Sequence, residues 1–490
     1  MGILMGITDQ TKLQNYQTDE AAAFQGQATE LYLPKNEQEI SAIFKEANKT
    51  KKLITISGGG TGVTGSRVPV YGGAVLSTEK ITRPQQSVPP GFTEVQTQGY
   101  TIYLNQIAKK ALCPASIPLA VLDTILADYA LSYPPDPTEM SATLGGTVAT
   151  NASGARTFAY GATRNWVECL RMVLPTGDIL DLPAAQTTAS KHTLVYNTEN
   201  LEIVVSIPEQ KDYDMPKTKN AAGLYLGSDM RPIDLFIGSE GILGVFTDIT
   251  LKLIERNTDI LGILTYFKSQ ADTLDFVDNI IQNNLSLSLE FFDAASLDFM
   301  RKQHPHIPQD AQAALFFELP SEDSLEIVAE AMEKHNAYHE SLIPYQKATE
   351  IHLFRHSLPE AINEYVRARV GKIASDIAVP HTHFREMQAY YQSISKETGV
   401  PFLMFGHIGN DHLHLNYLPE NAAQLKKAKT AYEKLLLKAV ELGGTVSAEH
   451  GVGKKQILPF LYGAKGLAII KNIKQQFDPQ LILNLGNMIK

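Results

Sequence analysis

The sequence predicts an α+β protein with two or three domains. Its 490 residues are about three times the length of a typical domain. Before about residue 255, short strand-like runs alternate with glycine-rich turns, and after about residue 258 strand-like runs alternate with helix-like runs. The second pattern is typical of an antiparallel sheet with helices on one face. We therefore expect one domain over residues 1–255, a second over 256–440 and a C-terminal segment over 441–490.

In the first domain, a helix is expected over residues 36–50, where Asn36 can cap the first turn and a glutamate follows three residues later. The run LITIS, residues 53–57, predicts a strand that leads into a glycine run, and GGAVLS predicts a second strand. The segment VFTDITLKL, residues 245–253, alternates apolar and polar residues and predicts a half-buried strand.

The second domain is expected to contain strands at LGILTYF, LSLEFF and AALFFEL, with helices at ADTLDFVDNIIQ and SLEIVAEAMEKH. An amphipathic helix is expected near residues 466–477 of the C-terminal segment.

Composition narrows the class of protein. Apolar residues make up 44% and charged residues 20%, which excludes wholesale disorder. The net charge of −10 argues against a general nucleic-acid binder. Two cysteines exclude a disulfide scaffold, and the chain shows neither a signal-peptide pattern nor an apolar run long enough to span a membrane. We expect a cytoplasmic protein, with peripheral attachment to the inner face of the membrane left open.

Three glycine-rich blocks carry the first functional signal. SGGGTGVTGSRVP, residues 57–69, has five glycines between positions 58 and 65, directly after a predicted strand. Glycine lets a backbone approach a phosphate closely, and successive N–H groups can then bind an anion. The spacing is neither the dinucleotide pattern GxGxxG nor the Walker pattern, and a tight turn without a ligand is the alternative. The other two blocks are YPPDPTEM…GGTVATNASG and GSEGILG, within residues 133–178 and 238–249.

These blocks resemble the flavin-binding domain of the vanillyl-alcohol oxidase family. More narrowly, they are similar to its FAD-dependent D-2-hydroxyacid dehydrogenases, whose motifs PRGGGTGLSG, PPDPxS, GGxxATNAGG, YG, GSEGTLG and NPGK occur in the same order. The final motif differs, because this chain has Asn484-Leu485-Gly486. The resemblance implies a two-domain fold, with a PCMH-type FAD-binding domain and an α+β cap domain, and a C-terminal segment that returns to the FAD. The first block lacks the histidine to which other members attach the flavin, so we expect non-covalent FAD.

The resemblance also carries the cofactor contacts over to residues of this chain. These are Gly58, Gly59, Gly60, Thr61, Gly62, Gly65, Ser66, Pro135, Asp136, Thr143, Gly146, Ser153, Glu240, Gly241 and Asn484.

A histidine-rich block, FGHIGNDHLHLNY at residues 405–417, carries the second signal. A turn in it can bring His407 beside His414, while His412, His414 and Asn416 share one face of the following strand. Two imidazoles with a carboxylate suit zinc or manganese, and Glu449 of SAEHGVG is the candidate carboxylate. Single histidines on a strand are more often hydrogen-bonded core or surface groups.

The related enzymes have GHIGDGNLHLN and SAEHGVG at these places. The resemblance therefore implies that His407, His414 and Glu449 are metal ligands, that Asn416 contacts substrate and that His450 is the catalytic base. This chain has Asp411 where the motif has glycine, and His412 where it has asparagine, so His412 is either a spare ligand or a group behind the ligands. Arg355 matches an arginine that binds the substrate carboxylate, and Lys372 is a weaker match for a lysine with the same task.

The expected activity is oxidation of a D-2-hydroxy acid, D-lactate foremost, with hydride transfer to FAD and proton removal by His450 beside a metal. His450 as an orienting group only is the alternative for that residue. D-2-hydroxyglutarate, glycolate and larger hydroxy acids or sugar lactones remain open as substrates, as do a non-redox FAD enzyme and a flavoprotein subunit of a larger oxidase. A quinone, cytochrome or electron-transfer flavoprotein is expected to accept the electrons. No nucleic-acid partner is expected, and a homodimer is left open.

Overall fold

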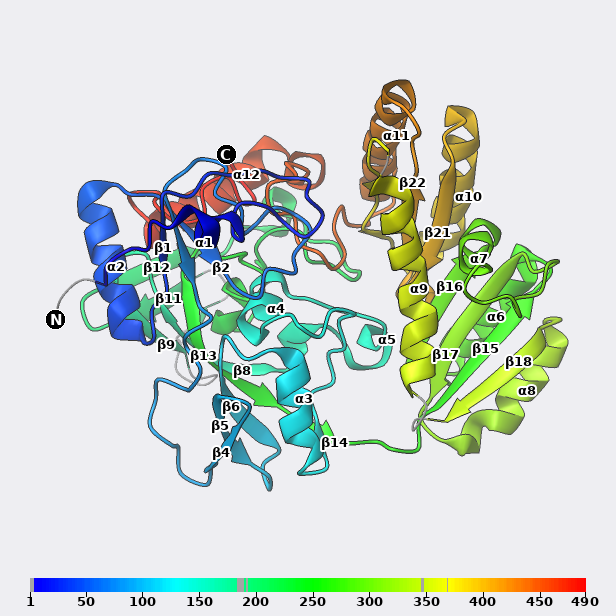
Figure 1. The fold of residues 1–490 in the computed structure, drawn as a ribbon, viewed down its shortest axis with the longest axis horizontal. Coiled ribbons are helices and arrows are strands. Elements are labelled where there is room, and N and C mark those ends of the chain that lie inside the picture. The colour runs from blue at the N-terminus through cyan, green and yellow to red at the C-terminus, as the bar shows by residue number, and fades with distance from the viewer. Residues whose placement is uncertain (1–3, 183–188, 191–192, 345–347, 368) are drawn as a thin grey trace.

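The computed structural model describes residues 4–182, 189–190, 193–344, 348–367 and 369–490. Two bodies lie side by side, and both chain ends lie on the left-hand body in Figure 1. That body contains the chain up to about residue 255 together with α12 (Leu458–Phe477). The right-hand body contains the strands and helices between about residues 261 and 441.

Two main sheets build the left-hand body. A parallel sheet has the order β1 (Glu30–Tyr32), β3 (Ala74–Ser77), β2 (Ile54–Ser57), and α2 (Glu37–Thr50) packs its apolar side into the same core. An antiparallel sheet has the order β4 (Thr93–Thr97), β5 (Tyr100–Asn105), β6 (Lys110–Pro114), β13 (Val245–Lys252), β8 (Val167–Val173), β9 (Ile179–Leu182). The smaller elements are α1 (Gln10–Gln14), α3 (Leu119–Ala127), β7 (Leu131–Ser132), α4 (Leu144–Thr150), α5 (Thr157–Tyr160), β10 (Ala189–Ser190), β11 (Thr193–Asn197), β12 (Glu202–Ser206) and β14 (Ile254–Glu255).

The predicted elements of this body are confirmed, with one correction. The Asn36 side chain caps α2 by accepting a hydrogen bond from the Glu39 N–H at 2.9 Å. Strand β13 is buried on nearly its whole length instead of half-buried. The reason is its central place, because β6 and β8 flank it and both of its faces are covered.

The right-hand body is built on one antiparallel sheet. Its order is β18 (Tyr338–Pro344), β15 (Leu261–Phe267), β17 (Ala313–Leu319), β16 (Ser288–Asp293), β21 (Phe402–Gly406), β22 (His412–Tyr417), β19 (Ile373–Ala374), and β20 (Ile377–Ala378) also pairs with β22. The helices are α6 (Gln270–Gln282), α7 (Ala294–Met300), α8 (Leu325–Lys334), α9 (Ala348–Arg367), α10 (His381–Thr398) and α11 (Ala422–Glu441).

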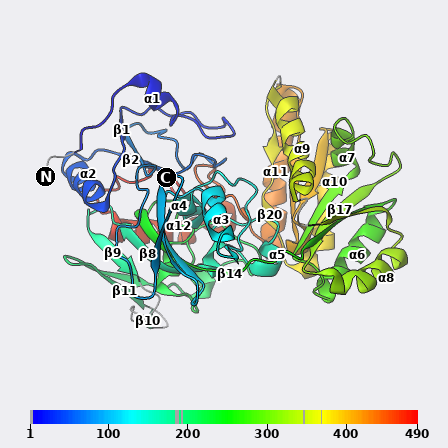
Figure 2. The same ribbon diagram turned by 60° about the horizontal axis from the view of Figure 1, so that its bottom comes forward.

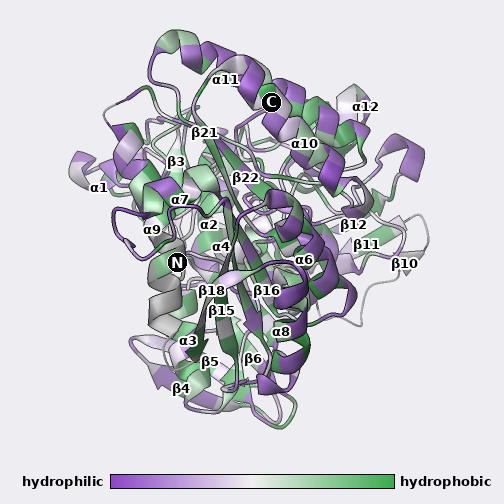
Figure 3. Ribbon diagram, turned by 90° about the vertical axis from the view of Figure 1, so that its right-hand side faces the viewer, coloured by the Kyte–Doolittle hydropathy of each residue, from purple (hydrophilic) through white to green (hydrophobic). Residues whose placement is uncertain are grey.

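Helices cover both faces of this sheet, so the expectation of helices on one face is wrong. Residues of α7 and α9 share a core with one set of strand side chains, and residues of α6, α8 and α10 share a core with the other set. Figure 3 shows the strands between α9 on one side and α6 and α8 on the other. Accordingly, every residue of β15 and β17 is buried, as expected for strands that are apolar on both faces.

The two bodies meet where α5 packs against β16 and the turn at Ile408–Asn410 (Figure 2). Next to α5, Arg156 donates two hydrogen bonds to Glu318 of β17, at 2.9 and 2.8 Å. The C-terminal segment rejoins the left-hand body, since the Asn484 N–H donates to the Ile54 carbonyl at 2.8 Å.

Candidate active site

The β21–β22 hairpin positions the histidines. His407 follows β21, and His412 and His414 lie on β22. The turn between the strands places Asp411 in the left-handed region with φ 55°, a conformation that aspartate adopts more readily than most residues. Gly406 has φ 127°, and a Cβ there would lie 2.9 Å from the His414 ring. Because the backbone crosses so close to His414, the His407 and His414 rings lie 5.6 Å apart.

Glu449 meets these two histidines from the C-terminal segment. His407 Nε2 lies 3.1 Å from Glu449 Oε2, and His414 Nε2 lies 3.2 Å from Glu449 Oε1. With His412, these residues offer ligand atoms that all lie within 4.8 Å of one another. Glu449 and His407 are buried. The structure thus brings together the three predicted metal ligands.

The hydrogen-bond partners of the two imidazoles are compatible with a cation between His407, His414 and Glu449. His407 Nδ1 lies 2.6 Å from the Glu290 carboxylate, and His414 Nδ1 lies 3.4 Å from the Ser375 carbonyl. Both neighbours are acceptors, so a proton on Nδ1 of each ring would leave the lone pair of Nε2, which faces Glu449, available to a metal ion. The lone pairs of both imidazoles and of Glu449 would then converge on one point, and the Glu290 carboxylate would support His407 from the other side of its ring. These residues fit a divalent zinc or manganese ion.

The charges of the buried cluster point the same way. Glu290, Asp376 and Glu449 are buried carboxylates, and Lys219 is a buried ammonium with 3% of its side chain exposed. Burial opposes ionisation of Glu449, yet Lys219 and the neighbouring imidazoles hold its pKa well below its usual range. Burial and Lys219 together lower the pKa of His412 to about 3, so this imidazole is neutral. Burial lowers the pKa of His407, yet Glu290 and Glu449 raise it overall, so the carboxylates of this cluster favour a positive charge among them.

His450 borders the same cluster. Its Nδ1 lies 3.3 Å from Asp376 Oδ2, and its Nε2 lies 3.4 Å from Glu449 Oε1. Burial alone would lower the pKa of His450, but the Asp376 and Glu449 carboxylates raise it overall. Asp376 Oδ2 also accepts hydrogen bonds from Ser447 Oγ at 2.6 Å and from the His450 N–H at 3.0 Å. The His450 side chain is 38% exposed, so a substrate can reach this otherwise buried cluster of residues from the side of His450.

Sequence reasoning missed three residues of this cluster. Asp376 lies four residues after Lys372, and nothing in the sequence signalled that its carboxylate contacts His450. Glu290 lies inside the apolar run of β16, where one acidic residue in a buried strand was the available signal. Lys219 belongs to a segment without a recognisable motif.

The glycine blocks form a second, separate arrangement. A Cβ at Gly58 would lie 2.8 Å from Thr143 Oγ1, and the Gly59 N–H donates to that oxygen at 3.2 Å. Thr143 caps α4, where its oxygen also accepts from the Gly146 N–H at 3.4 Å. Gly60 and Gly65 have φ of 86° and 76°, which glycine adopts most readily. The glycine loop therefore lies directly on the first turn of α4.

Two other segments that carry predicted cofactor residues contact each other. A Cβ at Gly154 would lie 1.8 Å from the Asp136 carbonyl, so the PPDP and NASG segments are in contact, and Pro135 is buried beside Asp136. The Ser153 hydroxyl is buried with no partner among the described residues, and a Cβ at Gly62 would meet nothing within 4 Å. Thr61 is half-buried. A free buried hydroxyl in one of these segments and open space at Gly62 fit a bound FAD.

Ser66, Glu240 and Asn484 join the two arrangements. Glu240 is buried and accepts hydrogen bonds from Ser66 Oγ and the Gly453 N–H, both at 2.7 Å. Asn484 accepts from the Ile56 N–H at 2.7 Å and donates to the Glu240 carbonyl at 2.9 Å, and a Cβ at Gly241 would collide with the Asn484 amide. These polar atoms hold the glycine loop to the segment after His450. Their contact with FAD stays a prediction.

The residues predicted to bind substrate are not brought together as clearly as the predicted metal ligands. Lys372 Nζ donates to Asn363 Oδ1 at 3.1 Å, and burial together with the nearby Lys455 lowers its pKa. Asn416 is buried on β22, with its amide donating to the His414 carbonyl at 3.4 Å. Arg355 belongs to α9, but its side chain lies outside the described part of the structure.

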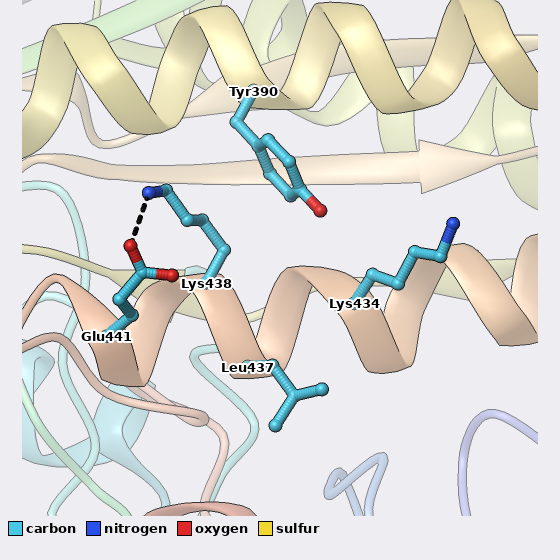
Figure 4. Close-up of a pocket in the computed structure, with 5 residues that line it drawn as sticks. All are labelled: Tyr390, Lys434, Leu437, Lys438 and Glu441. Atoms are coloured by element: carbon cyan, nitrogen blue, oxygen red, sulfur yellow. Dashed lines mark hydrogen bonds and ion pairs between the residues drawn. The ribbon is translucent and has the colours of Figure 1, made fainter.

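A shallow hollow on the right-hand body is not part of this site. It lies between α10 and α11, has a volume of about 300 Å³ and is lined by Tyr390, Lys434, Leu437, Lys438 and Glu441 (Figure 4).

Among the helices of the described residues, none has the length and apolar character that a membrane span requires.

Comparison with known proteins identifies the class. Residues 29–183 match the FAD binding domain model, and residues 261–488 match the model of FAD linked oxidases, C-terminal domain. The chain belongs to the FAD-linked oxidases, which confirms the predicted family and the FAD-binding domain. Within them it is an oxidoreductase of the D-lactate, D-2-hydroxyglutarate and glycolate oxidase group.

Three curated relatives illustrate this group. D-lactate dehydrogenase of Archaeoglobus fulgidus is 28% identical, over 93% of this chain and 90% of the relative. Glycolate oxidase subunit GlcD of Bacillus subtilis is 27% identical, over 96% and 91%. D-2-hydroxyglutarate dehydrogenase of Xanthomonas citri pv. viticola is 27% identical, over 99% and 94%. Among solved structures, an alkyldihydroxyacetonephosphate synthase superimposes with a TM-score of 0.68 at 14% identity, over 98% of this chain and 81% of that one, and so shows the fold alone.

Proposed function

We propose that the protein oxidises a D-2-hydroxy acid to the 2-oxo acid, with D-lactate as the first candidate substrate. The observation that carries the proposal is the position of His450, whose Nε2 lies 3.4 Å from the Glu449 carboxylate. The Nε2 atoms of His407 and His414 approach the same carboxylate to 3.1 and 3.2 Å. An imidazole in the position of His450 can take the proton from the hydroxyl group of an alcohol substrate. The curated relatives named above act on acids of this class, and they support the same assignment.

Each group has a distinct task in this reaction. Bound FAD supplies the acceptor for the hydride of the α-carbon, and a divalent ion held by His407, His414 and Glu449 supplies Lewis acidity for the hydroxyl. His450 takes the hydroxyl proton on Nε2 while Asp376 keeps the other ring nitrogen protonated and fixes the ring plane. Asn416, Arg355 and Lys372 are assigned to the substrate, the two cations to its carboxylate.

The reduced flavoprotein is expected to pass its electrons to a quinone, a cytochrome or an electron-transfer flavoprotein, which returns the flavin to its oxidised form. D-2-Hydroxyglutarate and glycolate are the alternative substrates, since curated relatives carry those names. A non-redox FAD enzyme, or a flavoprotein subunit that is inactive alone, are the alternatives to a self-sufficient dehydrogenase.

Anaerobic mixing tests the proposal. The FAD-loaded protein is mixed with D-lactate, L-lactate, D-2-hydroxyglutarate or glycolate while the flavin absorbance is recorded. We expect a D-acid to bleach the flavin, its L-enantiomer to fail, and a chelator to slow the bleaching. Absence of bleaching by every acid contradicts the dehydrogenase assignment, whereas chelator-insensitive bleaching contradicts only the metal.

A further inference from the structure

A lysine of the left-hand body reaches into the histidine cluster of the right-hand body. Lys219 Nζ lies 2.7 Å from Glu449 Oε2 and 3.2 Å from His412 Nδ1. Only 3% of the Lys219 side chain is exposed. An ammonium has three hydrogens and no lone pair, so Lys219 donates to both atoms and cannot itself be a ligand.

The backbone around Lys219 is fixed on both sides. The Thr218 hydroxyl donates to the Val379 carbonyl at 3.3 Å. The Asn220 side chain accepts from Thr445 Oγ1 at 2.6 Å, and the Ala221 N–H donates to the Ser447 carbonyl at 2.9 Å. Because neighbours on either side are held to the segments that carry the site, Lys219 has a defined place in the cluster.

His412 would be a metal ligand without this lysine. Lys219 can only donate to Nδ1 of this imidazole, so the ring proton belongs on Nε2, which lies 3.0 Å from Asp376 Oδ1. The lone pair of Nδ1 is then the free ligand atom, and it lies 3.9 Å from Glu449 Oε2 within the same group as His407 and His414. Lys219 occupies that lone pair.

We propose that Lys219 is a positioning residue that keeps His412 out of the metal coordination and so leaves one coordination position open for substrate. This inference rests on the proposed function, which places a divalent ion on His407, His414 and Glu449. Catalytic zinc sites keep three protein ligands and one open position, whereas four protein ligands make a closed, structural site. Lys219 also takes one oxygen of Glu449, which leaves the other oxygen to bind the ion.

The test measures metal binding as well as turnover. FAD-loaded protein is stripped with a chelator and titrated with Zn²⁺ in a calorimeter, for the wild type and for Lys219→Met, His412→Asn, His407→Asn and the Lys219→Met/His412→Asn double variant. Flavin reduction by D-lactate is recorded on the same samples, and flavin content and melting temperature report folding.

We expect Lys219→Met to bind Zn²⁺ at least about tenfold more tightly, because residues that hydrogen-bond to metal ligands change metal affinity by about that factor. The same variant is expected to lose flavin reduction. His412→Asn is expected to leave the affinity within about twofold, because this imidazole is not a ligand, whereas His407→Asn loses binding. The double variant is expected to return to the wild-type affinity. Lys219→Arg, which keeps the charge and its donors, should not gain affinity.

Two results overturn the inference while the proposed function stands: Lys219→Met binds Zn²⁺ no more tightly than the wild type, or His412→Asn weakens binding as much as His407→Asn. If Lys219→Met does not fold, the comparison of His412→Asn with His407→Asn still decides whether His412 is a ligand. If the wild type binds neither Zn²⁺ nor Mn²⁺, the inference and the metal in the proposed function both fall, and flavin bleaching by D-lactate then tests the remaining dehydrogenase assignment separately.

Discussion

The histidine cluster and the glycine loop differ in what they would offer a charged group. In the cluster, side chains from β16, β22, the segment around Lys219 and the C-terminal segment meet in a buried space, where each charge needs a partner. In the loop, the missing side chains of Gly58, Gly59 and Gly60 let one continuous backbone lie against Thr143 and Arg67. The comparison teaches that changes in the cluster should affect chemistry, and changes in the loop should affect retention of the cofactor.

Replacing His450 by alanine should give the largest effect on the cluster side. Loss of a general base costs roughly 10²–10⁴ in rate, while the glycine loop is untouched and the flavin should stay bound. The measurement is the rate of anaerobic flavin reduction by D-lactate, with flavin absorbance as the check on binding. His383→Ala, on the exposed start of α10, is the matched control. Near-normal rates in His450→Ala would remove His450 as the base and favour its orienting role.

Replacing Asp376 by asparagine should give a smaller loss, because the base remains. The amide nitrogen cannot accept the bonds that the carboxylate now receives, so His450 is held less well, and we expect the turnover number kcat to fall about 10–100-fold with little change in KM. Steady-state kinetics measure both constants. Asp310→Asn, at a side chain that is 58% exposed, serves as the control. A change in KM alone would mean that Asp376 acts on substrate binding instead.

Replacing Gly60 by alanine tests the loop side. Its φ of 86° is unfavourable for alanine, and the Cβ would lie 1.7 Å from the Arg67 guanidinium. A penalty of about 1–2 kcal/mol for this backbone conformation corresponds to about tenfold weaker FAD binding. Flavin retention after gel filtration and fluorescence titration of the flavin-free protein measure this. Gly99→Ala, in the turn between β4 and β5, has a similar φ of 82° and a Cβ that meets nothing within 4 Å, so it should leave FAD binding unchanged. Equal losses in both variants would show that backbone strain lowers FAD binding through general destabilisation and not through the glycine loop.

Replacing Arg156 by methionine tests the junction of the two bodies and should have the smallest effect on chemistry. It leaves Glu318, whose side chain is 11% exposed, without its two-point partner, and we expect the free energy of unfolding to fall by about 3 kcal/mol. Denaturant unfolding followed by fluorescence measures the loss. Arg83→Met removes an exposed ion pair with Glu94 and should cost less than about 1 kcal/mol. A turnover defect larger than that of Asp376→Asn would place Arg156 in the catalytic machinery.

Local patterns made much of this molecule predictable. The cap of α2, the strands on either side of the glycine run and the β21–β22 hairpin follow from residues close in sequence, and hydrogen bonds and pleating depend on such neighbours. The burial of β13 and the helices on both faces of the second sheet were missed, because the environment of a strand depends on elements far away in the chain.

The sequence by itself determined the family and the glycine loop, and it predicted His407, His414, Glu449 and His450 as site residues, which the structure brings together. Only the tertiary structure decided which groups contact these histidines: Asp376 contacts His450, Glu290 contacts His407, and Lys219 donates a hydrogen bond to His412. The physical reason is that a glycine turn is specified by its own backbone torsions. The proton and charge state of a buried imidazole, by contrast, depends on partners that approach it in space from remote segments.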